Sequence, residues 1–168
     1  MFNTNVNYEN LVMLLAPQDI TNAETPSSYM KLDQAQEAGF LVIFGAITSA
    51  TVADNITITV EACTAPAGTE VAVDFSYRLS GALGTNTWGA KTAATSAGFS
   101  ILNAVDNVMV WIDIDPAAIQ ADVADALYAR VFLSSPVDMT ACLVGVVGYT
   151  RPRYKQNTHK SATGAASA

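Results

Sequence analysis

The sequence predicts an all-β protein, an antiparallel β-sandwich or jelly-roll-like barrel with one short helix and an extended arm at each end. Three observations predict this class. Ile, Val and Thr, which favour strands, make up a quarter of the 168 residues. Strand-like stretches recur roughly every 10–15 residues, with turn residues between them. Strand and helix segments do not alternate, which disfavours a nucleotide-binding parallel sheet.

The N-terminal part is expected to hold an arm, a short strand and a link. Residues 1–10 are polar and rich in Asn, which favours an arm over a core segment. Leu11–Leu15 is a short apolar strand that we expect Pro17 to end. Residues 19–28 contain Pro26 and several turn-forming residues, so they are interpreted as a link.

Four elements follow in the middle of the chain. Residues 29–33 are expected to form a short edge strand, and residues 34–39 a loop or a single helical turn. Residues 40–48 are apolar at both odd and even positions, which indicates a strand with both faces covered. Residues 56–64 and 71–79 alternate with period two, which predicts two strands with Ile56, Ile58, Val60 and Ala62, and Val71, Val73, Phe75, Tyr77 and Leu79, turned inward.

The remaining elements complete the expected sandwich domain, residues 11–150. Shorter strands are expected at residues 87–92 and 99–102. Residues 107–115 form another alternating strand, with Val108, Val110, Ile112 and Ile114 inward. Pro116 ends it, and an Ala-rich helix follows at about 117–125. Two last strands are expected at residues 127–134 and 139–149, the second weakened or bulged at Gly145 and Gly148.

Charge and hydropathy argue against several classes of protein. Only 14% of the residues are charged, which is low for a soluble domain and excludes a disordered, solvating chain. The net charge of −7 argues against a general nucleic-acid binder. The longest apolar run has eight residues, so no membrane-spanning segment is expected. The N-terminus shows no basic region before an apolar segment, so we expect no secretory signal.

The basic residues are concentrated at the C-terminus. Residues 1–150 hold all 15 acidic residues and four bases, whereas residues 151–168 hold four bases and no acid. We expect this basic tail to dock on the acidic body of a neighbouring copy or on an acidic scaffold rather than on nucleic acid. The candidate contact residues are Arg151, Arg153, Tyr154, Lys155, His159 and Lys160.

No arrangement of residues predicts catalysis. His159 is the single histidine and lies in a segment without acids, so a catalytic triad is not expected. Cys63 and Cys142 are interpreted as two buried, unpaired thiols, although one disulfide between them is possible. The glycines fit neither a P-loop nor a dinucleotide motif, and no cofactor or enzyme activity is expected.

Two weaker binding hypotheses stay open. Asp113 and Asp115 share one strand face, and the helix could bring Asp122 close enough for a cation such as Ca²⁺, but a calcium-loop motif is absent. Trp88 and Trp111 could form a platform for a sugar, although such tryptophans more often fill cores or subunit contacts.

The order of six segments along the chain resembles that in a set of small virion proteins of tailed bacteriophages. These proteins are head decoration proteins or minor capsid proteins. The resemblance extends over about residues 29–157 and lies in the order of the segments: ITITVEACT, VDFSYRLSG, TWGAKTAATSAGF, VMVWIDIDPAAI, LYARVFLSS and LVGVVGYTRPRYKQ.

The resemblance implies a capsid decoration (cement) protein, a β-sandwich module that binds the assembled head shell and stabilises it. Its partners would be the major capsid protein and other copies of itself, with a trimer favoured. It would be made and assembled in the host cytoplasm and would lie on the exterior of the virion. The alternative is a head fibre or carbohydrate-binding module that contacts host glycans through exposed tryptophans.

Overall fold

The computed structural model describes residues 10–21, 23–49, 55–102, 106–135 and 139–152. The helix and strands, in chain order, are β1 (Asn10–Asp19), β2 (Glu24–Pro26), β3 (Met30–Lys31), β4 (Ala35–Ser49), β5 (Asn55–Cys63), β6 (Val71–Val73), β7 (Phe75–Leu79), β8 (Thr92–Ala94), β9 (Phe99–Leu102), β10 (Met109–Ile114), α1 (Pro116–Asp122), β11 (Tyr128–Ser134) and β12 (Met139–Pro152).

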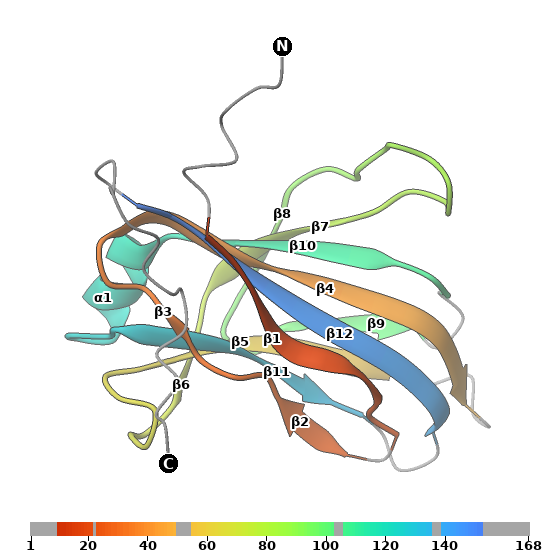
Figure 1. Ribbon diagram of the computed structural model, residues 1–168, viewed down its shortest axis with the longest axis horizontal. Coiled ribbons are helices and arrows are strands. Elements are labelled where there is room, and N and C mark those ends of the chain that lie inside the picture. The colour runs from red at the N-terminus through yellow and green to blue at the C-terminus, as the bar shows by residue number, and fades with distance from the viewer. Residues whose placement is uncertain (1–9, 22, 50–54, 103–105, 136–138, 153–168) are drawn as a thin grey trace.

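The strands form two antiparallel sheets that pack as the expected β-sandwich (Figure 1). Sheet A has six strands in the order β1-β12-β4-β10-β7-β8. Sheet B has the order β2-β11-β5-β6, with β3 beside β11 and β9 beside β5. The core lies between the sheets, where side chains such as Phe40, Val42, Ile112 and Val131 are fully buried.

The alternating strands confirm the predicted inward sets where the pattern is local and clean. Ile56, Ile58, Val60 and Ala62 of β5 are all fully buried, and so are Val110 and Ile112 of β10. Val108 and Ile114 are each 5% exposed. Period-two patterning therefore identified the core face of these two strands.

The predicted strand over residues 71–79 is two strands in different sheets. β6 pairs with β5 in sheet B, and β7 pairs with β10 in sheet A. The break falls at Asp74, whose carboxylate accepts a hydrogen bond from the Ser96 amide at 2.7 Å. The inward assignment is wrong at both ends, because Val71 is 44% and Leu79 37% exposed.

Two predicted breaks fall inside strands. Residues 35–39, expected as a loop or helical turn, begin β4 and pair with the C-terminal end of β12. Pro17 does not end β1, because β1 lies at the edge of sheet A, where a missing amide donor is tolerated. A register shift against β12 between Leu15 and Gln18 accommodates it.

Toward β4, β12 keeps a regular register from Val144 to Arg151, so neither Gly145 nor Gly148 is bulged on that side. Toward β1, the register shifts between Val146 and Val144, on either side of Gly145. Gly148 serves close packing instead, since a Cβ there would lie 2.6 Å from Leu14 Cδ1 and 2.8 Å from Met30 Sδ.

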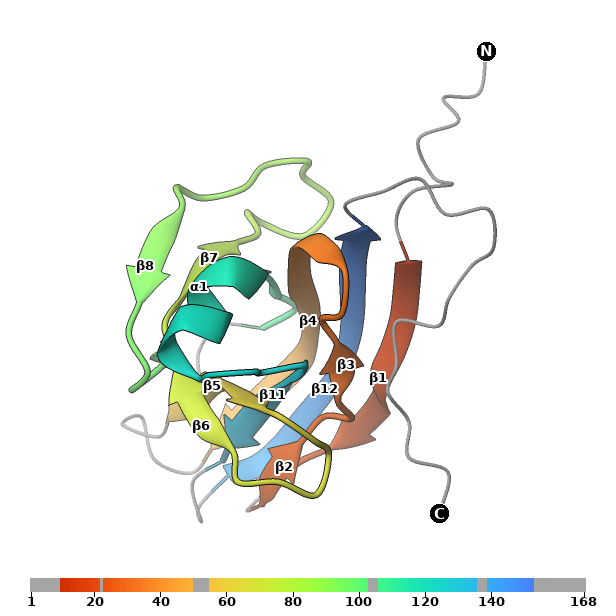
Figure 2. The same cartoon turned by 90° about the vertical axis from the view of Figure 1, so that its left-hand side faces the viewer.

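The expected helix is present and closes one end of the sandwich (Figure 2). Asp115 caps it, because its carboxylate accepts a hydrogen bond from the Ala117 amide at 2.9 Å, and Pro116 occupies the first turn. The helix ends at Asp122 rather than near residue 125, and Val123 follows in an extended conformation. This described helix is not long and apolar enough to cross a membrane.

The expected arms lie almost entirely outside the described residues, which begin at Asn10 and end at Pro152. The expected boundary between sandwich and tail at residue 151 falls inside β12, because Arg151 and Pro152 still pair with β4. Both predicted thiols, Cys63 and Cys142, are free and buried. Burial, followed by the charge of Asp19, raises the pKa of Cys142 to about 12, so the thiol stays protonated at neutral pH.

Candidate functional site

The outer face of sheet A is apolar and uncovered over much of its area. The expectation that both faces of residues 40–48 are covered is wrong, since Phe40, Val42 and Phe44 are buried but Ile43 is 42% exposed. Neighbouring strands add further exposed apolar side chains. We call the following set the apolar face: Leu11, Met13, Ile43, Met109 and Leu143 of the sheet, with Leu83 of the loop after β7.

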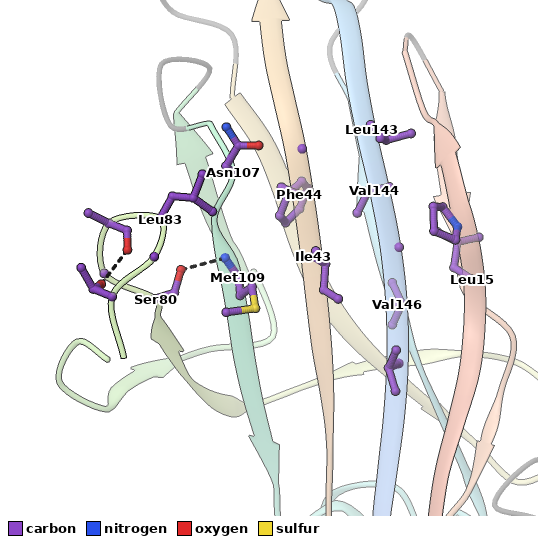
Figure 3. Close-up of a pocket in the computed structure, with 18 of the residues that line it drawn as sticks. Leu15, Ile43, Phe44, Ser80, Leu83, Asn107, Met109, Leu143, Val144 and Val146 are labelled. Carbon is purple, nitrogen blue, oxygen red and sulfur yellow. Dashed lines mark hydrogen bonds between the residues drawn. The ribbon is translucent and has the colours of Figure 1, made fainter. Parts of the chain in front are cut away.

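Strand register brings Ile43, Met109 and Leu143 close together and places Leu11 opposite Tyr149, at the far end of this set. Met109 of β10 pairs with Ile43 of β4, and Gly145 of β12 pairs with the same residue on its other side. Figure 3 shows Ile43 on the strand between those that carry Met109 and Leu143. Gly45 leaves room beside Leu143, because a Cβ at this position would lie 3.3 Å from Leu143 Cβ.

A groove of about 470 Å³ runs along this face, between the strands and the loop at residues 80–85. None of the described residues that line it carries a charge. The polar side chains at its border are short or neutral, among them Ser80, Thr85 and Asn107. The groove is therefore suited to an apolar, uncharged surface.

Backbone hydrogen bonds hold the loop that forms one wall of the groove. The Gly81 amide donates to the Thr87 carbonyl at 2.8 Å, and the Thr85 amide donates to the Ala82 carbonyl at 3.0 Å. Gly84 turns the chain in the left-handed region with φ of +80°. Leu83, just before this turn, is 81% exposed (Figure 3). The loop thus presents a leucine to solvent on an ordered turn.

A polar cluster occupies the other end of the same face. Asp113 Oδ1 accepts hydrogen bonds from Trp111 Nε1 at 2.7 Å and from the Tyr149 hydroxyl at 2.9 Å. Its Oδ2 lies 3.1 Å from Lys91 Nζ. The Tyr149 ring passes over Gly39, where a Cβ would lie 2.6 Å from Tyr149 Cε1. Glycine at this position therefore lets Tyr149 reach Asp113.

The electrostatics of this cluster favour the ionised carboxylate. Burial alone would raise the pKa of Asp113, but hydrogen bonds from Lys91, Trp111 and Tyr149 outweigh it and lower the pKa below its usual value. Burial and the adjacent carboxylate raise the pKa of Tyr149, so its hydroxyl stays protonated and donates to Asp113. Asp113 is therefore a negatively charged acceptor that orients its neighbours.

The cation hypothesis gains no geometric support. In the described part of the chain, no three His, Cys, Asp or Glu side chains are grouped so that they could hold a metal ion. Asp113 faces Lys91, and Asp115 caps α1. Asp113 and Asp115 do border a shared hollow of about 670 Å³, together with Glu37, but Asp122 does not line it.

The two tryptophans meet but do not form one flat platform. Their ring centroids are 6.2 Å apart with an interplanar angle of 78°, an edge-to-face contact. Trp111 also packs at 4.8 Å against Tyr149, and Asp113 accepts its indole hydrogen bond. Trp88 is 38% exposed. Glycan binding stays a prediction that depends on the exposed part of Trp88.

Of the candidate tail residues, the structure describes Arg151. It lies exposed in β12, with Nη1 2.9 Å from Glu37 Oε2, an ion pair within the same chain. Arg153, Tyr154, Lys155, His159 and Lys160 lie outside the described residues.

Sequence reasoning did not find a second polar cluster, on sheet B. Arg130 Nε lies 2.7 Å from Glu61 Oε2, Nη2 lies 3.2 Å from Glu70 Oε1, and Nη1 donates to the Tyr29 hydroxyl at 2.9 Å. Tyr29 in turn donates to Glu70. The Arg130 side chain is only 15% exposed. Its contacts link β11 to β5, to Glu70 just before β6 and to Tyr29 just before β3. The pairing of β11 with β5 creates this cluster, and no sequence pattern indicates it.

No family model matches the sequence, and no curated protein matches it. Among solved structures, the crystal structure of the SPBc2 prophage-derived protein YomS superposes on this fold with a TM-score of 0.42 and 13% identity. The alignment covers 84% of this chain and 91% of that chain. A likeness of this size assigns neither a family nor a function.

Proposed function

We propose that this chain is a structural protein of a tailed-bacteriophage particle, a capsid decoration protein that binds the assembled head shell from outside and stabilises it. The observation that carries the proposal is the apolar face. The largest contiguous apolar patch on a protein surface is often the site of a functional contact with another chain. The resemblance of its segments to head decoration proteins is the reason for proposing the phage head as the particle.

A protein of this kind acts by mass action and needs no turnover. Binding only the closed, expanded shell would stabilise that state, by an amount that grows with free concentration relative to Kd. The other partners we propose are further copies of this chain, with a trimer favoured by the resemblance. The proposed location is the virion exterior, after synthesis in the host cytoplasm.

The basic segment is the proposed contact with the major capsid protein. It begins at Arg151, in the last strand of sheet A, and continues with Arg153, Tyr154, Lys155, His159 and Lys160. A run of bases on an acidic chain can recognise an acidic surface of a partner while the sandwich itself is repelled from it. Such a contact should weaken as salt rises.

The test is co-sedimentation of the full-length protein with expanded, DNA-free shells of the phage that encodes it. We expect near-stoichiometric decoration in about 150 mM salt, and loss of binding in the Arg153→Glu/Lys155→Glu variant. Lys31→Glu/Arg78→Glu is the matched control, because it changes net charge equally on the described surface and should still bind. Full occupancy by the first variant would refute the role of the basic segment, and absence of wild-type binding would refute the proposed function.

A further inference from the structure

We propose that the apolar face is the surface through which copies of this chain associate with one another. This inference rests on the self-association proposed above and names its surface. It does not depend on shell binding.

The extent of the face matches what an interface requires. Its six side chains are 68% (Leu11), 62% (Met13), 42% (Ile43), 81% (Leu83), 36% (Met109) and 49% (Leu143) exposed. Dividing the burial energy of a large apolar side chain by the energy per Å² of buried surface gives roughly 100 Å² of apolar area for each side chain. With the exposed fractions above, the six side chains together expose roughly 340 Å² of apolar area. A standard interface buries about 800 Å² per partner, of which about 450 Å² is apolar. The face therefore supplies most of the apolar area that one side of such an interface needs.

The charge distribution restricts where a second copy can bind. Each chain carries a net charge of −7, so two copies repel each other over most of their surfaces. The groove at the centre of the apolar face is lined by uncharged residues throughout its described lining. Contact here brings no like charges into direct opposition. A partner with a charged docking surface would have to desolvate its charges here without any opposite charge to meet them.

The backbone of the sheet favours a folded surface over an extended peptide. The inner strands below the face, β12, β4 and β10, are paired on both sides within sheet A, whereas β1 is paired on one side only. A peptide laid flat on the face would bury amide and carbonyl groups for which the sheet offers no partners. The sheet surface of a second copy brings mainly side chains, because its own backbone is already paired within its sheets. Leu83, on its ordered turn, is placed to insert between the copies.

The test is the mass of the full-length protein, by sedimentation velocity from about 1 to 100 μM. We expect an oligomer. Ile43→Lys and Leu143→Lys, made separately, should each raise the dissociation constant more than tenfold, because each would bury an unpaired ammonium group in the contact. Far-ultraviolet circular dichroism and urea unfolding show that each variant is folded. Both positions are already 42% or more exposed, so the sandwich should tolerate them.

Leu102→Lys and Val71→Lys are the matched controls. These residues are 56% and 44% exposed but belong to sheet B, so their variants should associate like wild type. Association should also persist in about 1 M sodium sulfate, which strengthens apolar contacts and screens ionic ones.

A wild-type monomer at 100 μM would overturn the inference, as would wild-type association of both sheet A variants or equal loss in the controls. Failure of shell binding alone would leave this result unchanged, because the Arg153→Glu/Lys155→Glu variant should associate like wild type.

Discussion

Replacing Asp113 by alanine tests whether its carboxylate organises the polar end of the outer face. The change removes the acceptor of the Trp111 indole N–H and of the Tyr149 hydroxyl. A donor left without its acceptor costs about 1–3 kcal/mol when buried, and this site is only partly buried, with the Asp113 side chain 29% exposed. The Lys91 ion pair adds little, because the lysine is 49% exposed. We expect a loss of about 2–4 kcal/mol in the free energy of unfolding.

The Asp113→Asn variant should be milder. The amide oxygen can still accept from Trp111 and Tyr149, and only the added strength of a charged acceptor is lost, about 1 kcal/mol. Asp33→Asn is the control, since its partner Lys31 lies 3.4 Å away at an exposed site, and it should change stability by less than about 0.5 kcal/mol. Urea unfolding at neutral pH measures all three variants, and an Asp113→Ala loss no larger than that of Asp33→Asn would refute the reasoning.

The effect of the Asp113 carboxylate should also depend on pH. Its folded-state pKa is lowered, because the hydrogen bonds from Lys91, Trp111 and Tyr149 outweigh the cost of burial. A lowered folded-state pKa stabilises the protein above the unfolded value of about 3.9, and this stabilisation is lost as pH falls through the folded-state pKa. The stability difference between wild type and Asp113→Asn should therefore be constant near neutral pH and shrink below about pH 4. A difference that grows on acidification would contradict this assignment.

Three further outcomes are expected. Gly39→Ala should destabilise by about 1–3 kcal/mol in urea unfolding, because its Cβ would overlap the Ile112 carbonyl oxygen of β10, whereas Gly89→Ala, with its nearest atom at 3.4 Å, should be close to neutral. Arg130→Met should cost about 3–5 kcal/mol by the same assay, since it leaves Glu61 without the cation it faces at 2.7 Å, and a change below about 1 kcal/mol would show that the cluster is dispensable. If the chain binds host glycans, Trp88→Ala should abolish a specific signal on a glycan array, and a signal that survives would place the sugar elsewhere.

Local sequence patterns were enough to predict the all-β class, the short helix after Asp115 and the buried faces of β5 and β10. Alternation with period two assigns the two faces of a strand, and Asp followed by Pro before an Ala-rich stretch favours the start of a helix. The same local reasoning placed both thiols in buried strands. It predicted the wrong breaks at Pro17 and at residues 35–39, because edge position and long-range pairing decide whether such segments continue as strands.

The coverage of each face and the encounters between polar groups depend on the assembled sheets. The sequence of an apolar run such as residues 40–48 does not show whether one or both faces of its strand are covered. In the described part of the folded protein, no second layer covers the exposed apolar side chains on the outer face of sheet A. Asp113 meets Tyr149 because β12, β4 and β10 pair in one particular register, and the sequence separation of these residues carries no trace of that contact. Sequence patterns could not reveal either feature, since both arise from pairing between segments far apart in the chain.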